Sequence, residues 1–162
     1  MNPIESQMTQ LRLHGMARSF QALMETHQAL ELSLSDGLAL LLQAEHDERN
    51  NRRYARLRKN AAFRYPASVE QLSHSPASGL DKSLISRLAT ADYLEKGASV
   101  LITGATGCGK SFLASALGHH ACMQGYTVAY FNFQKLLLQT KLARAAGTIA
   151  RLFDHLAKTR LL

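Results

Sequence analysis

The sequence has 162 residues, of which 46% are hydrophobic, so it is long enough for an ordinary domain with a buried core and too apolar for gross disorder. The sequence contains no apolar run of 18 residues, so it predicts no membrane span. Residues 1–20 lack the apolar centre of a signal peptide. The net charge of +7 favours an anionic partner such as nucleic acid where the cations cluster. Two cysteines cannot make a disulfide framework, so we expect a cytoplasmic protein.

The first 61 residues predict a pair of helices. Residues 4–30 predict one helix, because apolar side chains recur at helical spacing, namely Leu13, Met16, Ala17, Phe20, Leu23 and Met24. Gly15 is expected to weaken its centre by about 1 kcal/mol relative to alanine. Ser33 and Ser35 are candidate N-caps of a second helix over about 36–61.

The remainder of the chain predicts alternating helices and strands. Residues 64–80, rich in proline and serine, predict a linker, and residues 81–97 predict one or two short helices that start at Asp81. Short β-branched runs predict strands at 99–103 and 127–131, with Leu161 and Leu162 as the beginning of another. Further helices are expected at 110–124, 134–145 and 148–158. This alternation predicts a parallel α/β sheet.

A glycine-rich segment, GATGCGKS at 104–111, fits the spacing G-x-x-x-x-G-K-[ST] between the predicted strand at 99–103 and a predicted helix. Successive backbone N–H groups must wrap a phosphate chain, and side chains would obstruct that wrap. Gly104, Gly107 and Gly109 permit the unusual φ values and the close approach that this requires. A chance match of the pattern is the alternative, and the strand–loop–helix context argues against it.

The side chains of this segment predict the rest of a nucleotide site for ATP and Mg²⁺. Lys110 can reach the β- and γ-phosphates, and Ser111 can bind Mg²⁺. Cys108 is either a reactive thiol that bound ATP shields or, as we favour, a small residue without a role. The expected nucleotide-binding residues are Gly104, Ala105, Thr106, Gly107, Cys108, Gly109, Lys110 and Ser111.

A basic stripe lies in the second predicted helix and consists of Arg49, Arg52, Arg53, Arg56 and Lys59. Their offsets of 0, 3, 4, 7 and 10 residues place them on one helix face. Like charges so spaced repel one another, which is easier to understand if the stripe meets DNA phosphates. Such contact would be largely independent of base sequence. The alternative is a solvated face partly balanced by Glu45, Asp47 and Glu48. The leucines at 136–138 and Leu142 are interpreted as helix core and not as a partner site.

Residues 11–25 (LRLHGMARSFQALME) and 44–63 (AEHDERNNRRYARLRKNAAF) resemble the N-terminal helical region of the IstB-type transposition helper ATPases. Residues 79–131 and 143–162 resemble the opening of their ATPase core. The Walker A pattern alone is shared by many NTPases. The LRLHGMA opening, the basic ERNNRR helix and ALGHHACMQGY together are much more specific, and the resemblance covers nearly the whole sequence.

The resemblance implies an AAA+ P-loop NTPase that assembles on DNA with ATP, self-associates and directs a transposase to its target. It implies a parallel-sheet core, here incomplete, preceded by an N-terminal α-helical region. The expected organisation is a basic, DNA-associated helical region at 1–63, the linker at 64–80, and the N-terminal part of the ATP-binding domain at 81–162.

The sequence departs from this family in its catalytic parts. The family's second acidic motif follows a strand that would here begin at Leu161, and no such motif, sensor or arginine-finger segment occurs in residues 1–162. Because phosphoryl transfer depends on positioned charge, we expect ATP binding without appreciable hydrolysis by this chain alone. The usual neighbours of the P-loop strand also come later in the family's chain order, so the chain is expected to be a fragment.

Two other functions compete with transposition. A DnaC-type helicase loader shares the ATPase core and would bind a replicative helicase, although its N-terminal region is a weaker match. Alternatively, the chain is a non-enzymatic DNA-binding fragment in which residues 1–62 function and the ATPase half is vestigial.

Overall fold

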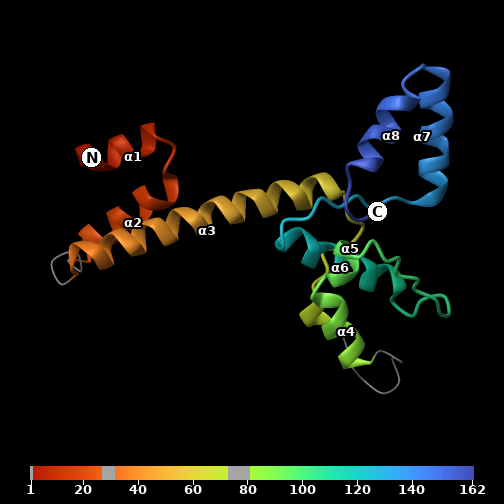
Figure 1. The fold of residues 1–162 in the computed structure, drawn as a ribbon, viewed down its shortest axis with the longest axis horizontal. Helices are drawn as coiled ribbons and strands as arrows, with labels where there is room; N and C mark the ends of the chain where they lie inside the picture. Colours follow the sequence, from red (N-terminus) through yellow and green to blue (C-terminus); the bar gives the residue numbers. More distant parts are fainter. Residues whose placement is uncertain (1, 27–31, 73–80) are drawn as a thin grey trace. The chain divides into compact units, whose positions relative to one another are not determined.

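The computed structural model describes residues 2–26, 32–72 and 81–162 (Figure 1). The chain forms two compact units, Met1–Arg53 and Tyr54–Leu162. Their boundary falls inside the long helix α3 (Leu34–Ala61), so α3 contributes residues to each. Within the described ranges, no helix is both long and apolar enough to cross a membrane.

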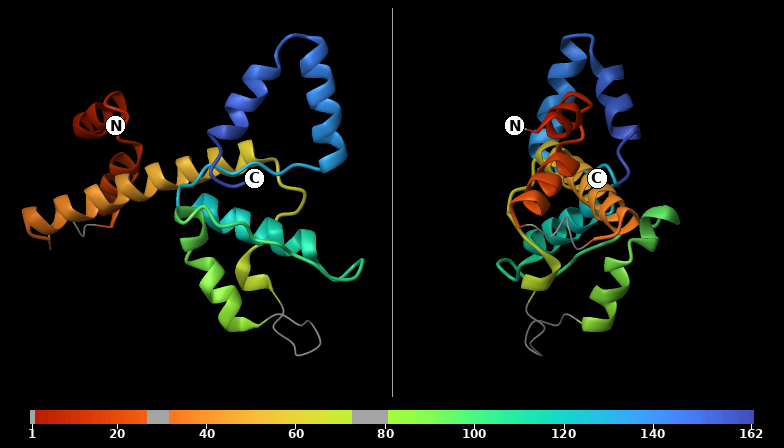
Figure 2. Two further views of the ribbon diagram at one scale, coloured as in Figure 1. Left: turned by 45° about the vertical axis from the view of Figure 1, so that its right-hand side comes forward. Right: turned by 90° about the vertical axis from the view of Figure 1, so that its left-hand side faces the viewer.

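The first unit contains α1 (Pro3–Gln10), α2 (His14–Glu25) and the beginning of α3. α2 lies beside the beginning of α3 in Figure 1 and in the left view of Figure 2. The prediction of a single helix over 4–30 is wrong. The chain turns after α1, where Arg12 adopts a φ of 60°, and an α-helix of L-residues does not continue through a left-handed residue. The last residues of that predicted helix, 27–30, lie outside the described ranges.

The beginning of α3 agrees with one of the two predicted caps. The Asp36 N–H donates a hydrogen bond of 3.1 Å to the Ser33 hydroxyl, so Ser33 is the capping residue. Ser35 lies within the helix. The helix then continues to Ala61, which confirms the predicted range of about 36–61.

Gly15 lies where the backbone of α2 comes close to that of α3. A Cβ atom on Gly15 would lie 2.4 Å from the Ala44 carbonyl oxygen and 2.7 Å from the Glu45 Cα. Real side chains do not tolerate such distances to backbone atoms. Gly15 is therefore required for the packing of these helices, and its low helix propensity is the lesser effect.

A buried carboxylate holds the start of α2. Glu45 is only 5% exposed and accepts hydrogen bonds from the N–H groups of Gly15 (2.8 Å) and Met16 (3.3 Å) and from Arg49 Nε (2.7 Å). α2 has no capping side chain next to it in sequence, so Glu45 takes that role from α3. Burial alone raises the pKa of Glu45, but these hydrogen bonds and the Arg49 charge outweigh it and hold the pKa below its ordinary value.

The second unit is organised around α6 (Lys110–Met123), which has a hydrophobic cluster at each end. The first half of α6 packs with η2 (Val69–Gln71) and α4 (Lys82–Ala89). This cluster consists of Ala67, Leu72, Ile85, Leu113, Ala116 and Leu117. The second half packs with the last turns of α3 and with α5 (Asp92–Glu95). That cluster consists of Leu57, Ala61, Ala91, Leu94, Ala121, Cys122 and Val128.

The remaining helices follow the sequence predictions closely. The Asp81 side chain accepts from the Ser83 N–H at 2.8 Å and caps α4, as expected. The predicted helices at 134–145 and 148–158 are α7 (Phe133–Ala145) and α8 (Ile149–Ala157), which form a hairpin (Figure 2). Part of the predicted linker, residues 73–80, lies outside the described ranges.

The predicted parallel-sheet core is wrong: within residues 2–26, 32–72 and 81–162 there is no strand, only one isolated parallel bridge between Val128 and Leu161. A strand exists by pairing, and local propensity cannot supply the partner. The Tyr130 N–H donates to the Ala61 carbonyl at the end of α3, not to a strand. In residues 99–103 no backbone group pairs with another described residue, and the Leu101 side chain is 88% exposed.

A histidine joins the segment after α3 to α6. His119 is buried, its Nε2 lies 3.1 Å from the Tyr65 carbonyl oxygen, and its ring lies against Phe63 with centroids 4.1 Å apart. Burial lowers the pKa of His119; the bond to Tyr65 opposes this and the Arg58 charge adds to it. The neutral ring therefore connects the segment that follows α3 with the helix that begins at Lys110.

Candidate nucleotide-binding site

The loop at 104–111 has the backbone conformation that its glycines predict. Gly104, Gly107 and Gly109 adopt φ values of 151°, 84° and 85°, which residues with a side chain rarely take. Gly104 is restricted further, because an added Cβ would lie 2.9 Å from the Cys108 sulfur. Residues 104–109 are all exposed, so the loop is open to solvent. It leads directly into α6.

Lys110 folds back across this loop. Its Nζ donates hydrogen bonds to the carbonyl oxygens of Gly104 (2.8 Å) and Ala105 (2.7 Å). The Cys108 sulfur lies 3.9 Å from the same nitrogen. The ammonium group of Lys110 therefore lies against the backbone of the glycine-rich loop. Sequence reasoning missed these carbonyl partners, because nothing in the residue pattern indicates a side chain to backbone contact of this kind.

The N-terminus of α6 is open. Gly109 is the N-cap and has no side chain, and the first helical bond runs from the Leu113 N–H to the Gly109 carbonyl at 2.9 Å. Among the described residues, nothing accepts a hydrogen bond from the N–H groups of Lys110, Ser111 or Phe112. Such donors, with the positive end of the helix dipole, form a ready anion site.

The basic stripe of α3 is partly neutralised. All five side chains are exposed. Arg49 pairs with Glu45 at 2.7 Å and Arg52 pairs with Glu48 at 3.1 Å, and Arg18 of α2 also pairs with Glu48. The predicted balancing by Glu45 and Glu48 is thus confirmed, whereas Asp47 accepts from Gln43 instead.

The second part of the stripe differs from the first. Arg56 and Lys59 form no ion pair with any residue in the described part of the chain. The sequence reasoning overlooked two further cations nearby, each next to an aromatic ring. The Arg58 guanidinium lies 5.8 Å from the centre of the Tyr54 ring, and that of Arg64 lies 5.2 Å from the centre of the Tyr65 ring. The sequence held a signal for both contacts, because Tyr54 precedes Arg58 by four residues and Tyr65 directly follows Arg64.

The interpretation of the α7 leucines as helix core is wrong for most of them. Leu137, Leu138 and Leu142 are 45%, 57% and 60% exposed, and Leu136 is half-buried. Phe133, at the start of the helix, is 71% exposed. The hairpin with α8 is too small to cover all sides of α7, so an apolar surface remains in contact with solvent.

Comparison of the sequence with known proteins relates the chain to a family. The family model described as IstB-like ATP binding protein matches residues 6–162. A Pseudomonas fluorescens protein, named for insertion sequence IS1162 and for ATP binding, is 40% identical over 158 residues, which cover 97% of this chain and 68% of that protein. Two Sinorhizobium fredii proteins with names of the same kind are 35% and 34% identical over 99% of this chain.

The chain spans about two thirds of the length of these relatives, 65% and 66% of the two from Sinorhizobium fredii. The match includes both the helical N-terminal segment and the glycine-rich loop with its lysine. It therefore confirms the resemblance found in the residues themselves. The chain belongs to the family of IstB-like ATP binding proteins.

Proposed function

We propose that this chain binds the triphosphate of ATP in the loop at 104–111. The observation that supports this most directly is the open N-terminus of α6, where three N–H groups have no acceptor among the described residues and Lys110 lies alongside. Bound phosphates would accept from these donors. Lys110 would exchange its two carbonyl acceptors for phosphate oxygens, so the lysine needs little movement to reach its ligand.

Ser111 is the proposed protein ligand of Mg²⁺. It is exposed at the first turn of α6, and its hydroxyl makes no hydrogen bond to the described residues. No cluster of three or more His, Cys, Asp or Glu side chains suitable for a metal occurs in the described ranges. The ion would therefore depend on one hydroxyl, the phosphate oxygens and water, which is how Mg²⁺ is commonly held beside a nucleotide.

The test is equilibrium binding of a fluorescent ATP analogue with Mg²⁺ to the wild-type chain and to Lys110→Met, which keeps the length of the side chain and removes its charge. We expect affinity to fall by about 30- to 100-fold, the cost of one or two charge-assisted hydrogen bonds. Lys135→Met, a lysine on α7, is the matched control. Equal binding by Lys110→Met would contradict the proposal.

Cysteine alkylation offers an independent readout of the same site. Cys108 is exposed in the loop, whereas Cys122 is buried, and burial raises the pKa of its thiol to about 11. Iodoacetamide should label Cys108 alone, and MgATP should slow that labelling several-fold. Labelling at an unchanged rate under saturating MgATP would show that the nucleotide does not cover the loop.

We further propose that α3 contacts DNA phosphates and that the chain acts with a transposase. The relatives are named for insertion sequences, which favours this partner over a replicative helicase. The unpaired cations Arg56 and Lys59 support the DNA contact, because they carry charge that no described carboxylate compensates. Co-purification of the tagged chain with a co-expressed insertion-sequence transposase, with and without DNA, tests the partnership.

A further inference from the structure

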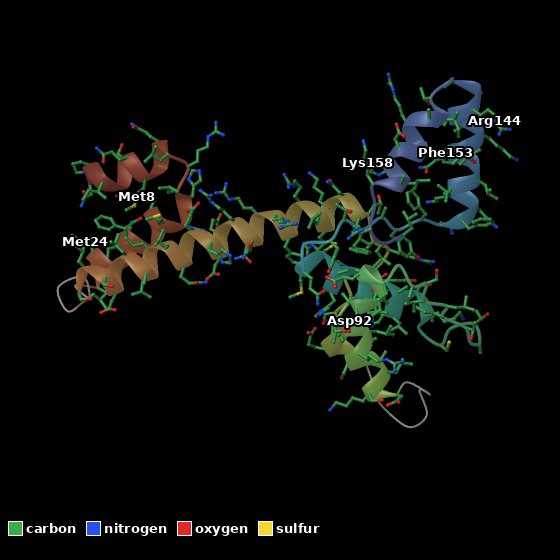
Figure 3. All side chains as sticks on the ribbon, viewed as in Figure 1. Met8, Met24, Asp92, Arg144, Phe153 and Lys158 are labelled. Atoms are coloured by element: carbon green, nitrogen blue, oxygen red, sulfur yellow. The ribbon has the colours of Figure 1, made fainter. Side chains whose placement is uncertain are left out.

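One face of α7 combines exposed apolar and cationic side chains. Four residues lie along one side of the helix, because their offsets from the first are 0, 4, 8 and 11 residues. They are Phe133, Leu137, Lys141 and Arg144. Phe133 and Leu137 are 71% and 45% exposed, and both cations are exposed. Figure 3 labels Arg144 near the C-terminal end of this helix. We call these four residues the α7 stripe; α7 has no acidic residue.

An apolar groove of about 340 Å³ lies in the first unit, between α1, α2 and the start of α3. Figure 3 labels Met8, one of its lining residues on α1. Several of its walls are open to solvent, with Ile4, Leu34 and Leu38 exposed by 47%, 82% and 47%. We call this the N-terminal groove. Its lining residues are Ile4, Met8, Phe20, Leu23, Leu32, Ser33, Leu34, Gly37, Leu38 and Leu41.

The surroundings of the N-terminal groove are acidic. The described segments that form it, 2–11, 19–26 and 32–44, contain three acidic residues and no lysine or arginine. Two arginines border these segments, Arg12 and Arg18, and Arg18 pairs with Glu48. The acidic residues are Glu5, Glu25 and Asp36. The groove therefore suits an occupant with two large apolar side chains followed by positive charge. The α7 stripe has this composition, with its apolar half first and its cationic half last.

We propose that the N-terminal groove of one chain binds the α7 stripe of a second copy. Phe133 and Leu137 enter the groove, where an aromatic anchor in an apolar pocket is the usual source of binding energy. Lys141 and Arg144 then face the acidic rim, which orients the helix. The groove and the stripe are different surfaces, so the contact is head-to-tail and can be repeated from copy to copy. It needs neither nucleotide nor DNA, and so it is independent of the proposed function.

Sedimentation velocity without nucleotide tests this contact, at protein concentrations from about 5 to 200 micromolar. The wild-type chain should form assemblies that grow with concentration. Leu34→Lys alters the groove and Phe133→Lys alters the stripe, each at an exposed position, so the folds should persist by circular dichroism. Each variant alone should associate at least about tenfold more weakly. Ile4→Lys, in α1, should behave like Leu34→Lys.

Mixing the two variants provides the sharper result. Phe133→Lys keeps an intact groove and Leu34→Lys keeps an intact stripe, so an equal mixture should form a dimer and grow no further. Phe153→Lys, at a 56% exposed aromatic on α8, is the matched control and should assemble like the wild type. A monomeric wild type, a mixture that stays monomeric, or a loss of assembly in Phe153→Lys would each overturn the proposal.

Discussion

The helices α2 and α6 begin in opposite ways. The start of α2 already has an anion, because Glu45 accepts from the Gly15 and Met16 N–H groups and is almost fully buried. The start of α6 has none in the described part of the chain, where the N–H groups of Lys110, Ser111 and Phe112 have no acceptor. Both helix ends offer the same donors and the same dipole. The difference supports the proposal that the start of α6 binds phosphate, because of these two helix ends only that of α6 lacks an acceptor in the described residues.

The glycines at the two ends follow the same division. Gly15 is required because α3 backbone lies against it, whereas Gly107 and Gly109 have no atom within 4 Å of an added Cβ and are required by their positive φ values. One glycine brings protein backbone close to a helix end. The others leave room at a helix end for a ligand.

The largest expected effect is that of Gly15→Ala. The added methyl group would overlap backbone atoms of Ala44 and Glu45, so the first unit should lose about 3 kcal/mol of unfolding free energy. Gly37→Ala is the matched control, because Gly37 lies in α3 with open space around it and should gain up to about 1 kcal/mol. Urea unfolding measures both. Equal effects of the two substitutions would refute the proposed close packing.

Next in size is the acid sensitivity that Glu45 gives to the first unit. Its folded pKa lies below the ordinary value of 4.5, so its contribution is present above that pH and is lost as the pH falls through the folded pKa. Glu45→Gln should cost about 1 to 2 kcal/mol at pH 7, and this cost should shrink as the pH falls below 4.5 and through the lowered folded pKa. Urea unfolding over a series of acidic pH values measures this. Glu48→Gln, which breaks more exposed ion pairs, should cost less than about 0.5 kcal/mol.

Ser111→Ala should distinguish the contribution of Mg²⁺ to ATP affinity from that of the phosphate contacts at the start of α6. Without its hydroxyl, affinity for ATP should fall by about tenfold when Mg²⁺ is present. With EDTA instead of Mg²⁺ the variant should bind ATP as well as the wild type does. A loss of the same size in both conditions would mean that Ser111 contacts phosphate directly. Ser115→Ala, which removes a side-chain bond to the Ser111 carbonyl, controls for damage to α6.

The smallest effect distinguishes the two halves of the basic stripe. For binding to duplex DNA, the slope of log K against log salt should decrease by about 0.9 in Arg56→Gln, which removes one unpaired cation. Arg49→Gln should change the slope by less than half as much, because Glu45 already compensates that charge. Filter binding over a salt series measures both slopes. Equal changes would show that DNA breaks the Arg49–Glu45 pair.

The helices of the second unit could be predicted from sequence because their signals are local. Asp81 caps α4, and the glycine-rich loop fixes the start of α6 at Lys110. The single helix predicted across Arg12 failed because the turn there is set by packing: Gly15 and Glu45 bring α2 against α3, thirty residues away in sequence. No periodicity reports such a distant contact.

The prediction of a parallel sheet was wrong for a related reason. Residues 99–103 and 127–131 have strand-forming composition, but a ladder needs a neighbour, and Tyr130 donates instead to Ala61. In the candidate site, the spacing of the glycines and the lysine was enough to predict a glycine-rich loop that leads into a helix. The ion pairs that neutralise Arg49 and Arg52, and the exposure of Leu137 and Phe133, depend on tertiary structure.

The most direct test is an NMR titration of the ¹⁵N-labelled chain with MgATP, following backbone amide shifts. We expect the amides of Gly107 through Phe112 to shift in a saturable manner, because their N–H groups would donate to phosphate oxygens. The amides of Gly15 and Met16 should stay in place, because Glu45 already occupies them. Unchanged amides at 107–112 under saturating MgATP would contradict the claim that the open start of α6 is the nucleotide site.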